Sequence, residues 1–142
     1  MKILVDASVG VKWFILEDYS VNALKILEDY ISGNVELYAL DIFRAQVVSI
    51  LRKYFLEGYI DMNALTESCK VLQEMEINYI EMDWEILEDA LSYSLENNIS
   101  LYDAIYIIAS KRLGASIVTA DQHLIDSLKN KELEIIDLGS YT

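Results

Sequence analysis

The sequence contains little cysteine, proline or glycine, and each shortage excludes a class of protein. Cys69 is the single cysteine among 142 residues, so no disulfide can form within the chain, and a reducing cytoplasm is the expected compartment. With no proline and only 5 glycines, the chain offers neither a Gly-rich phosphate loop nor a low-complexity linker. It also lacks a signal peptide and an apolar run of about 20 residues, so we expect a soluble, non-exported protein with no part in a membrane.

Basic side chains are scarce as well, and the resulting charge limits the partners. The 24 Asp and Glu residues outnumber 11 Lys and Arg residues, which gives a formal net charge of -13. Such a surface repels phosphate at long range, which excludes a broad basic platform for nucleic acid. A nuclease that meets phosphate through bound metal ions remains compatible with this charge. The length and the 54% of hydrophobic residues predict one core, so we expect residues 1–142 to form a single domain.

Apolar runs alternate with helical patterns along the chain. The expected strands cover residues 3–5, 35–40, 78–84, 116–119 and 133–138. The expected helices cover residues 9–16 with Ser8 as cap, 21–31, a stretch from the cap Asp41 to about Glu57, 62–75, 85–96, 101–113 and 121–130. Because most strands are continuous apolar runs, the sheet should be parallel and covered on both faces. The predicted fold class is α/β, a three-layer α/β/α sandwich with a central, mostly parallel sheet.

Three aspartates fall outside the carboxyl ends of the expected strands, where open α/β sheets gather their functional groups. Asp6 directly follows the first strand, Asp103 lies in the first turn of the helix over 101–113, and Asp121 follows the strand over 116–119. That helix is about 18 Å long at about 1.5 Å per residue, and the turn and strand after it run back in the opposite sense. The chain therefore brings Asp103 and Asp121 to one end of the sheet, and Asp6 joins them if the first strand is a neighbour.

Carboxylates that share a pocket repel one another unless a cation offsets their charge. Oxygen ligands without a thiolate or imidazole cluster favour Mg²⁺ or Mn²⁺ over zinc or copper. One or two such ions can generate a hydroxide and stabilise both oxygens of a phosphodiester under attack. We therefore interpret Asp6, Asp103 and Asp121 as metal ligands of a catalytic site. The alternative stays open that Asp103 belongs to a capping box with Ser100 and that Asp121 only caps its own helix.

Three segments resemble the motifs of one known family. Residues 5–14 (VDASVGVKWF), 100–106 (SLYDAIY) and 118–124 (VTADQHL) look like the first, third and fourth motifs of PIN-domain ribonucleases, and within them of VapC-type toxins. The resemblance covers nearly the whole chain, in the family's order and spacing. It implies a PIN fold, endonucleolytic cleavage of RNA with Mg²⁺ or Mn²⁺, a homodimer, and inhibition by a small VapB-type antitoxin.

The segment over residues 41–52 (DIFRAQVVSILR) departs from the family pattern. The resemblance places Gln46 where the family has an acidic Glu. Glutamine offers a neutral carbonyl oxygen or a hydrogen bond but no negative charge, so weaker metal binding and weaker cleavage are expected. The simpler interpretation, a surface glutamine on a polar stripe with Ser49 and Lys53, stays open.

Five further side chains near these motifs are candidates for lesser roles. The resemblance implies that the hydroxyls of Ser8 and Thr119 orient the site, with ordinary capping as the alternative. Lys12 and Arg44 are candidate contacts to RNA phosphate, although most single basic residues only belong to a solvated face. His123 is the single histidine. Since no second nitrogen or sulfur ligand is near it in sequence, we interpret it as a surface residue of the last helix.

Other acid-bearing α/β classes fit the sequence less well. Phosphatases of the haloacid-dehalogenase type need Asp-x-Asp after the first strand, where this chain has Ser8. Receiver domains need an acidic pair there and a lysine after the last strand, and a dinucleotide binder needs a Gly-rich turn. A non-catalytic PIN-like binding or scaffold module is the remaining alternative, favoured by Gln46 and by the negative charge.

Surplus apolar surface predicts self-association. The helix over 101–113 and the segment over 54–60 carry more apolar and aromatic side chains than one side of a sheet needs. An isologous two-fold contact is the simplest way to bury them, so we expect a homodimer.

Overall fold

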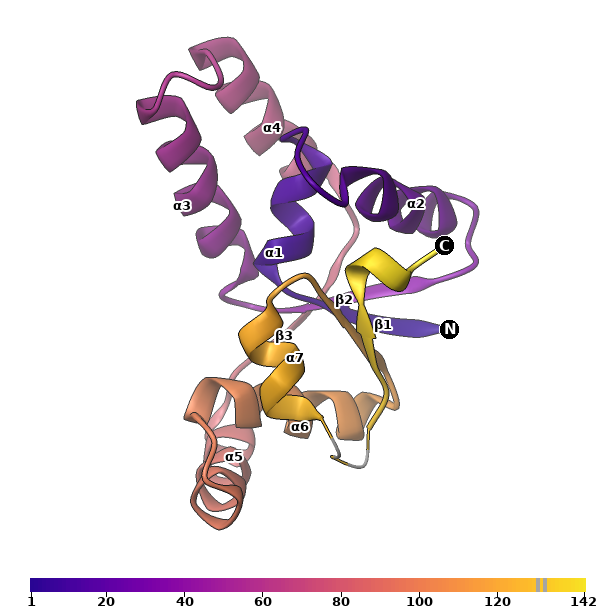
Figure 1. Cartoon of the computed structure of the whole chain (residues 1–142), viewed down its shortest axis with the longest axis vertical. Coiled ribbons are helices and arrows are strands. Elements are labelled where there is room, and N and C mark those ends of the chain that lie inside the picture. The colour runs from indigo at the N-terminus through magenta and orange to yellow at the C-terminus, as the bar shows by residue number, and fades with distance from the viewer. Residues whose placement is uncertain (130, 132) are drawn as a thin grey trace.

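A parallel sheet lies at the centre of the molecule (Figure 1). The computed structural model describes residues 1–129, 131 and 133–142. Within these residues the sheet has five strands in the order β3-β2-β1-β4-β5, and every neighbouring pair is parallel. The strands are β1 (Lys2–Val5), β2 (Glu36–Leu40), β3 (Asn78–Ile80), β4 (Ser116–Thr119) and β5 (Ile135–Asp137).

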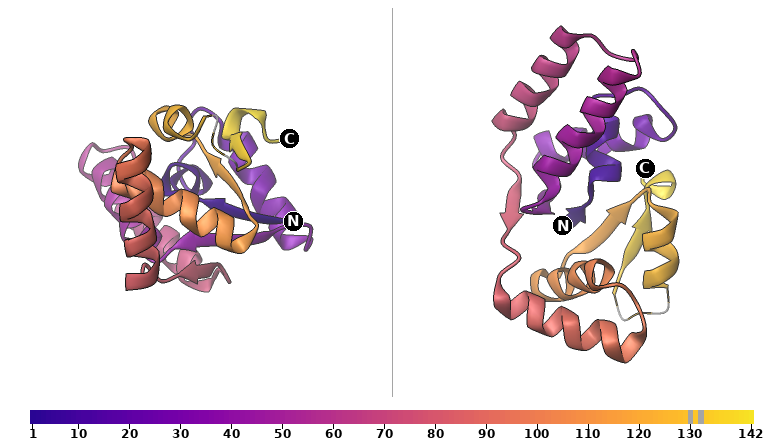
Figure 2. Two further views of the ribbon diagram at one scale, coloured as in Figure 1. Left: turned by 90° about the horizontal axis from the view of Figure 1, so that it is seen from below. Right: turned by 90° about the vertical axis from the view of Figure 1, so that its left-hand side faces the viewer.

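Helices precede or follow each strand and cover the sheet. They are α1 (Ala7–Gly10), the 3₁₀ turn η1 (Val11–Trp13), α2 (Ser20–Ile31), α3 (Phe43–Leu56), α4 (Met62–Glu74), α5 (Trp84–Asn97), α6 (Leu101–Leu113), α7 (Gln122–Leu128) and the 3₁₀ turn η2 (Leu138–Ser140). In Figures 1 and 2, α3 and α4 form a hairpin that extends away from the sheet. None of the helices in the described part of the chain is long and apolar enough to cross a membrane.

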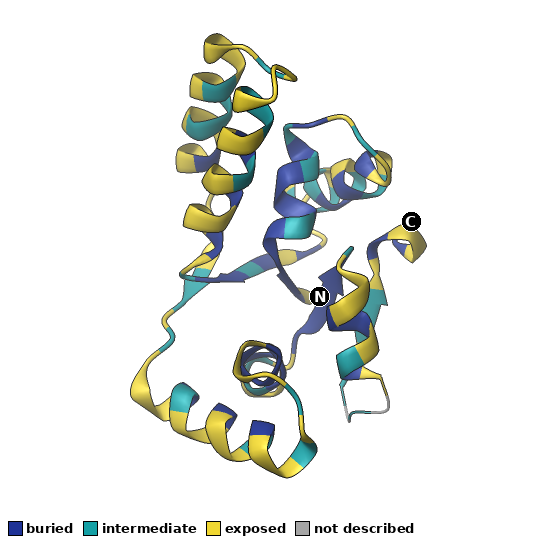
Figure 3. Ribbon diagram, turned by 60° about the vertical axis from the view of Figure 1, so that its left-hand side comes forward, coloured by how far each residue is buried: buried dark blue, intermediate teal, exposed yellow. Residues whose placement is uncertain are grey.

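The sheet separates two hydrophobic cores, because successive side chains of a strand point to opposite faces. Ile3 and Val5 of β1 pack with α1, α2, α3 and α4, whereas Leu4 packs with α5, α6 and α7. Figure 3 shows buried residues along β1 and on the inner side of α6, and exposed residues on the outer turns of α5. This arrangement confirms the predicted three-layer α/β/α sandwich.

The chain directly after β1 packs tightly against α3. A Cβ atom built on Gly10 would lie 2.5 Å from Cζ of Phe43, so a residue without a side chain is needed for this approach. Phe43, Val47 and Leu51 form the buried stripe of α3. This packing fixes the rotation of α3 about its axis, and thereby determines which of its side chains border the cavity described below.

Several predicted boundaries agree with the structure. The bounds of α6 and β4 are those expected from the sequence. Asp61 caps α4 by accepting a hydrogen bond from the backbone N of Ala64 at 2.8 Å. Ser100 caps α6 through the backbone N of Asp103 at 3.1 Å. Helices α4 and α6 were predictable because each begins at a capping side chain and ends at a left-handed or non-helical residue.

Two predicted caps are wrong. The helix expected over 9–16 is the short pair α1 and η1, and its N-cap is Asp6 rather than Ser8. Ser8 lies inside α1, where its hydroxyl is hydrogen-bonded to Asp6 and to the loop after β4. The N-cap of α3 is Ile42, which makes no side-chain cap. Asp41 instead accepts a hydrogen bond from the backbone N of Met82 at 3.4 Å, which joins the chain after β2 to the chain after β3.

Three predicted ends differ from the structure. The strand expected over 78–84 stops at Ile80, because Asp83 caps α5 by accepting from the backbone N of Ile86 at 2.9 Å. The last strand covers only Ile135–Asp137 instead of 133–138. The last helix ends at Leu128, and its predicted end at Asn130 lies outside the described residues.

Most apolar residues of α6 are buried in the hydrophobic core of the chain. Ile105 and Ala109 are 1% exposed and Ala104 and Ile107 are fully buried, because α6 lies between its neighbouring helices and the sheet. Most of the predicted apolar face of α6 is therefore buried within the chain, whereas Leu101 and Tyr102 in its first turn are exposed. The tip of the α3–α4 hairpin, predicted for the same role, does expose apolar side chains, among them Tyr59.

Candidate active site

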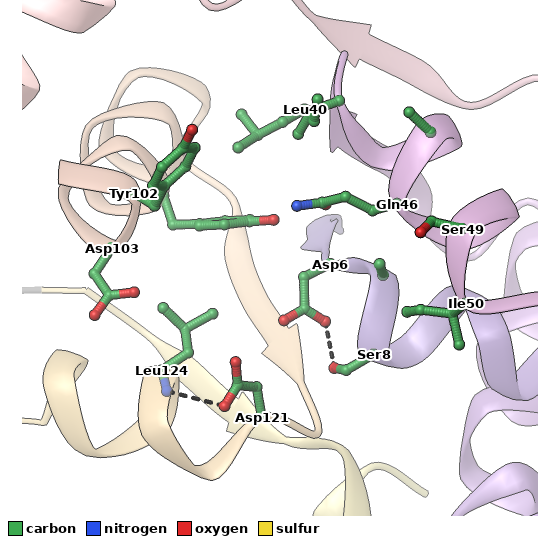
Figure 4. Close-up of a pocket in the computed structure, with 14 residues that line it drawn as sticks. Asp6, Ser8, Leu40, Gln46, Ser49, Ile50, Tyr102, Asp103, Asp121 and Leu124 are labelled. Atoms are coloured by element: carbon green, nitrogen blue, oxygen red, sulfur yellow. Dashed lines mark hydrogen bonds between the residues drawn. The ribbon is translucent and has the colours of Figure 1, made fainter. Parts of the chain in front are cut away.

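The three predicted aspartates line one cavity at the carboxyl end of the sheet. Asp6 follows β1, Asp121 follows β4, and these strands are paired in the sheet, which is the neighbour relation that the sequence left open. Asp103 is in the first turn of α6. The cavity has a volume of about 600 Å³, within the usual range of about 300–1,000 Å³ for a ligand site. Figure 4 shows the side chains of Asp6, Asp103 and Asp121 around it.

Asp6 is held by two hydroxyls from different strand ends. Ser8 Oγ donates to Asp6 Oδ1 at 2.5 Å, and Thr119 Oγ1 donates to Asp6 Oδ2 at 2.6 Å. Ser8 Oγ also accepts from the backbone N of Ala120 at 2.9 Å, and Thr119 Oγ1 accepts from the backbone N of Asp121 at 3.0 Å. The predicted pair Ser8 and Thr119 thus joins the loops after β1 and β4 around the carboxylate of Asp6.

Burial dominates the electrostatics of Asp6. Desolvation raises the pKa of this carboxyl above its ordinary value, the hydrogen bonds from Ser8 and Thr119 partly offset that rise, and the charge of Asp121 adds to it. The folded protein therefore binds the Asp6 proton more tightly than the unfolded chain does. Without a compensating cation, stability falls as the pH rises from the unfolded carboxyl range through the raised value.

The other two aspartates differ in how their oxygens are used. Asp121 caps α7, since its Oδ1 accepts from the backbone N of His123 at 3.0 Å and of Leu124 at 3.5 Å. The alternative prediction, that Asp121 caps its own helix, is therefore confirmed for Oδ1. Asp103 is 8% exposed, and its Oδ2 is a buried atom with no hydrogen-bond partner among the described residues. His123, with a side chain 79% exposed on α7, places Nδ1 3.8 Å from that oxygen.

Gln46 faces the cavity. It lines the wall that α3 contributes, together with Ser49 and Ile50, and Figure 4 shows its side-chain amide pointing inward. The amide makes no hydrogen bond to any residue in the described part of the chain. Gln46 is solvent-exposed as well as lining the cavity, so its position agrees both with a surface glutamine on a polar stripe and with a role beside the acids.

Two tyrosines of the cavity were not singled out from the sequence. Tyr102 and Tyr106 lie with Asp103 on one side of α6, and both line the cavity. Burial raises the pKa of the Tyr106 hydroxyl strongly, and the charges of Asp6, Asp121 and Asp103 raise it further. The signal was present in the helical spacing, because residues 102, 103 and 106 share a face.

The two predicted RNA-binding residues lie outside the cavity lining and are engaged elsewhere. Lys12 Nζ is 2.9 Å from Glu17 Oε1, and its side chain is only 12% exposed. Arg44 stacks over the ring of Tyr79, with its guanidinium carbon 4.2 Å from the ring centroid. Either side chain would have to leave its partner to contact a phosphate, so their predicted role rests on no contact seen in the structure.

The acids of the cavity fit a divalent cation. Within the described residues no Lys or Arg forms an ion pair with Asp6, Asp103 or Asp121. The unpartnered oxygen of Asp103 and the raised pKa of Asp6 both indicate a lack of positive charge here. The same residues form no preassembled group of three Asp, Glu, His or Cys ligands. A hard cation held by one or two carboxylates and completed by waters, as Mg²⁺ usually is, suits this arrangement.

Comparison with known proteins places the chain in a family. The family model described as PIN domain matches residues 3–129. This chain belongs to the PIN domain family. It is 27% identical over 130 residues to Ribonuclease VapC3 of Pyrobaculum aerophilum, with 89% of this chain and 94% of that protein covered. The matched range contains every residue that lines the cavity.

Solved structures support the fold of this PIN domain. A crystal structure of a protein from Pyrobaculum aerophilum matches with a TM-score of 0.69 and 21% identity, covering 99% of this chain and 91% of the other. A toxin–antitoxin complex from Klebsiella pneumoniae matches with a TM-score of 0.66 and 15% identity, covering 96% and 97%. The resemblance found in the sequence is thereby confirmed at the level of family and fold.

Proposed function

We propose that this PIN domain is a metal-dependent endoribonuclease that acts as a VapC-like toxin. The observation that carries the proposal is the gathering of Asp6, Asp103 and Asp121 around one cavity, where no Lys or Arg of the described residues forms an ion pair with them. Kinship with a named ribonuclease over 89% of the chain supports RNA as the substrate. The site residues are the same as those expected from the sequence, with Ser8 and Thr119 as positioning residues and Gln46 in the wall.

Mg²⁺ or Mn²⁺, when bound, supplies an activated hydroxide and offsets charge on the phosphodiester. Asp6, Asp103 and Asp121 would hold the ion through carboxylate oxygens. The hydroxyls of Ser8 and Thr119 keep both oxygens of Asp6 in place before the ion arrives.

Tyr106 and Gln46 complete the cavity wall with neutral groups. A tyrosine hydroxyl is protonated at neutral pH, and burial raises the pKa of Tyr106 further, so this group can donate a hydrogen bond at the cavity wall. Gln46 adds no negative charge. We therefore expect the cation to bind more weakly than it would beside a fourth carboxylate.

The same proposal includes partners and a compartment. The similarity to a toxin–antitoxin complex supports a small VapB-type antitoxin as a partner of this chain. An Arg or Lys side chain of such a partner would neutralise the acids of the cavity and compete with the metal ion. A homodimer in the cytoplasm is the proposed state, and the exposed apolar tip of the α3–α4 hairpin is compatible with a subunit contact. Light scattering that gives the 16.3 kDa monomer mass would rule out the homodimer.

Purified protein should cut single-stranded RNA when Mn²⁺ or Mg²⁺ is present and stop when a chelator is added. The Asp121→Asn variant, purified in the same way, controls for contaminating nucleases. Cleavage that is equal in the variant, or equal with chelator, would refute the assignment.

A non-catalytic PIN-like binding or scaffold module is the second candidate, because Gln46 removes one expected negative charge from the site. It predicts that Mn²⁺ neither raises the melting temperature nor supports cleavage. Calorimetric titration with Mn²⁺ separates the two candidates, since the nuclease requires binding and the scaffold does not.

A further inference from the structure

Helix α3 has a charge opposite to that of the chain. It contains Arg44, Arg52 and Lys53 and no acidic residue, in a protein whose net charge is -13. By contrast α5, on the other side of the sheet, contains four acidic residues and no basic one. A local positive helix on a negative protein is where a polyanion would be expected to approach.

One basic residue of α3, Lys53, lies on the helix face that forms the wall of the cavity. Gln46, Ser49 and Ile50 line it, and position 53 follows them by seven, four and three residues. Residues at these spacings share one face of a helix. Lys53 therefore lies on the cavity-facing side of α3, about 10 Å beyond Gln46 along the axis at about 1.5 Å per residue.

Lys53 is available for a ligand, unlike the two basic residues predicted from the sequence. It is exposed, and it forms no ion pair with any residue of the described ranges. Lys12 is paired with Glu17, and Arg44 is stacked on Tyr79 at a side of α3 that does not line the cavity. Arg52 is also exposed, but its position is rotated by about 100° from that of Lys53.

We propose that Lys53 binds a backbone phosphate of the RNA. This phosphate is next along the strand to the phosphate that enters the acidic cavity. This inference rests on the proposed ribonuclease function and adds a substrate contact to it. A strand that approaches Asp6, Asp103 and Asp121 meets long-range repulsion, and an ammonium group on the adjoining turns of α3 offsets part of it. Lys53 acts as a substrate-binding residue, so its removal should affect the binding of RNA and not the chemical step.

The test compares Lys53→Gln with Lys70→Gln. Lys70 is exposed on α4 and lies outside the cavity lining. Its substitution by glutamine makes the same change in net charge as Lys53→Gln, so it serves as the matched control. The probe is a fluorescein-labelled single-stranded RNA of about 12 nucleotides, measured by anisotropy in EDTA, with cleavage kinetics in Mn²⁺ as the second readout. We expect Lys53→Gln to weaken binding about 3- to 10-fold at low salt and to lower the salt slope by about 0.7. It should raise KM by the same factor and leave kcat unchanged, and Lys70→Gln should behave as wild type.

Each of the following outcomes would contradict one specific part of the proposal. Wild-type protein that neither binds nor cleaves RNA would refute the ribonuclease function itself. RNA binding and KM that are equal in wild type and Lys53→Gln, or equally weakened in both variants, would refute the role of Lys53 while leaving the ribonuclease in place. A loss in Lys53→Gln of binding to polyglutamate but not to RNA would assign this face of α3 to an acidic protein segment instead.

Discussion

The two sides of the cavity differ in how their polar groups are held. On the side formed by the loops after β1 and β4, both oxygens of Asp6 accept hydrogen bonds from hydroxyls that are themselves fixed by backbone amides. On the side formed by α3 and α6, Asp103 Oδ2 is buried without a hydrogen bond, and the Gln46 amide has none within the described residues.

One half of the site is preorganised by hydrogen bonds, whereas the polar groups of the other half gain partners when a ligand binds. A hydrogen-bonded carboxylate keeps its geometry whether or not a cation is bound, whereas an unpartnered buried oxygen costs free energy until something binds to it. Substitutions on the two sides should therefore have different effects on activity, metal binding and stability.

The largest effect is expected for Asp6→Asn on the hydrogen-bonded side. Removing this charge should lower the rate of RNA cleavage by about 10³-fold, or about 4 kcal/mol of transition-state stabilisation. Because ionised Asp6 is buried and destabilising in the metal-free protein, the variant should melt at the same temperature or higher without metal. Single-turnover cleavage and thermal unfolding measure the two effects. Asp18→Asn, an exposed aspartate away from the cavity, is the matched control.

Asp103→Asn tests the side that lacks hydrogen bonds. We expect about a 10²-fold loss of cleavage, near 2.7 kcal/mol, and loss of most of the stabilisation that Mn²⁺ gives the wild type. That stabilisation amounts to about 2.7 kcal/mol when the free ion is at 100 times Kd. The metal-free variant should be more stable than wild type, because an uncompensated buried charge is removed. A less stable metal-free variant would show that the charge of Asp103 is compensated, for which His123 Nδ1, 3.8 Å from Oδ2, is the candidate group.

Thr119→Val tests how much the hydrogen bonds to Asp6 contribute. Thr119 is fully buried, and its hydroxyl donates to Asp6 and accepts from the backbone N of Asp121. A valine of the same shape should lower the free energy of unfolding by about 2 kcal/mol, the usual value for a hydrogen bond to a charged group. Urea unfolding measures this, with the exposed Thr66→Val on α4 expected to change stability by less than about 0.5 kcal/mol. An equal loss in the Asp6→Asn background would indicate that Thr119 stabilises the fold through its hydrogen bond with the backbone N of Asp121 and not through the charge of Asp6.

The sequence predicted the strand-end acids better than the hydrogen bonds around them. Asp6, Asp103 and Asp121 were found because the lengths of α6 and β4 follow from clear caps and apolar runs. The family resemblance linked Ser8 and Thr119 to the site, whereas the local pattern indicated only a helix cap at Ser8, because a local rule cannot reveal a partner 111 residues away. The pairing of Lys12 with Glu17 and the free face at Lys53 likewise depend on how η1 and α3 are rotated, which long-range packing decides.

The smallest effect in this series is expected for Gln46→Glu. Its amide faces the cavity without a hydrogen bond within the described residues, so glutamate would add a full charge near the cation while size and helix propensity barely change. We expect Mn²⁺ to bind about tenfold more tightly, which is about 1.4 kcal/mol, and RNA cleavage to rise. The metal-free variant should be slightly less stable than wild type, because a fourth carboxylate adds to the repulsion around Asp6. Gln73→Glu on α4, which makes the same change outside the cavity, should alter neither quantity. Calorimetric titration with Mn²⁺ and thermal unfolding without metal decide the matter, and a Gln46→Glu variant that behaves like its control would mean that position 46 takes no part in binding the ion.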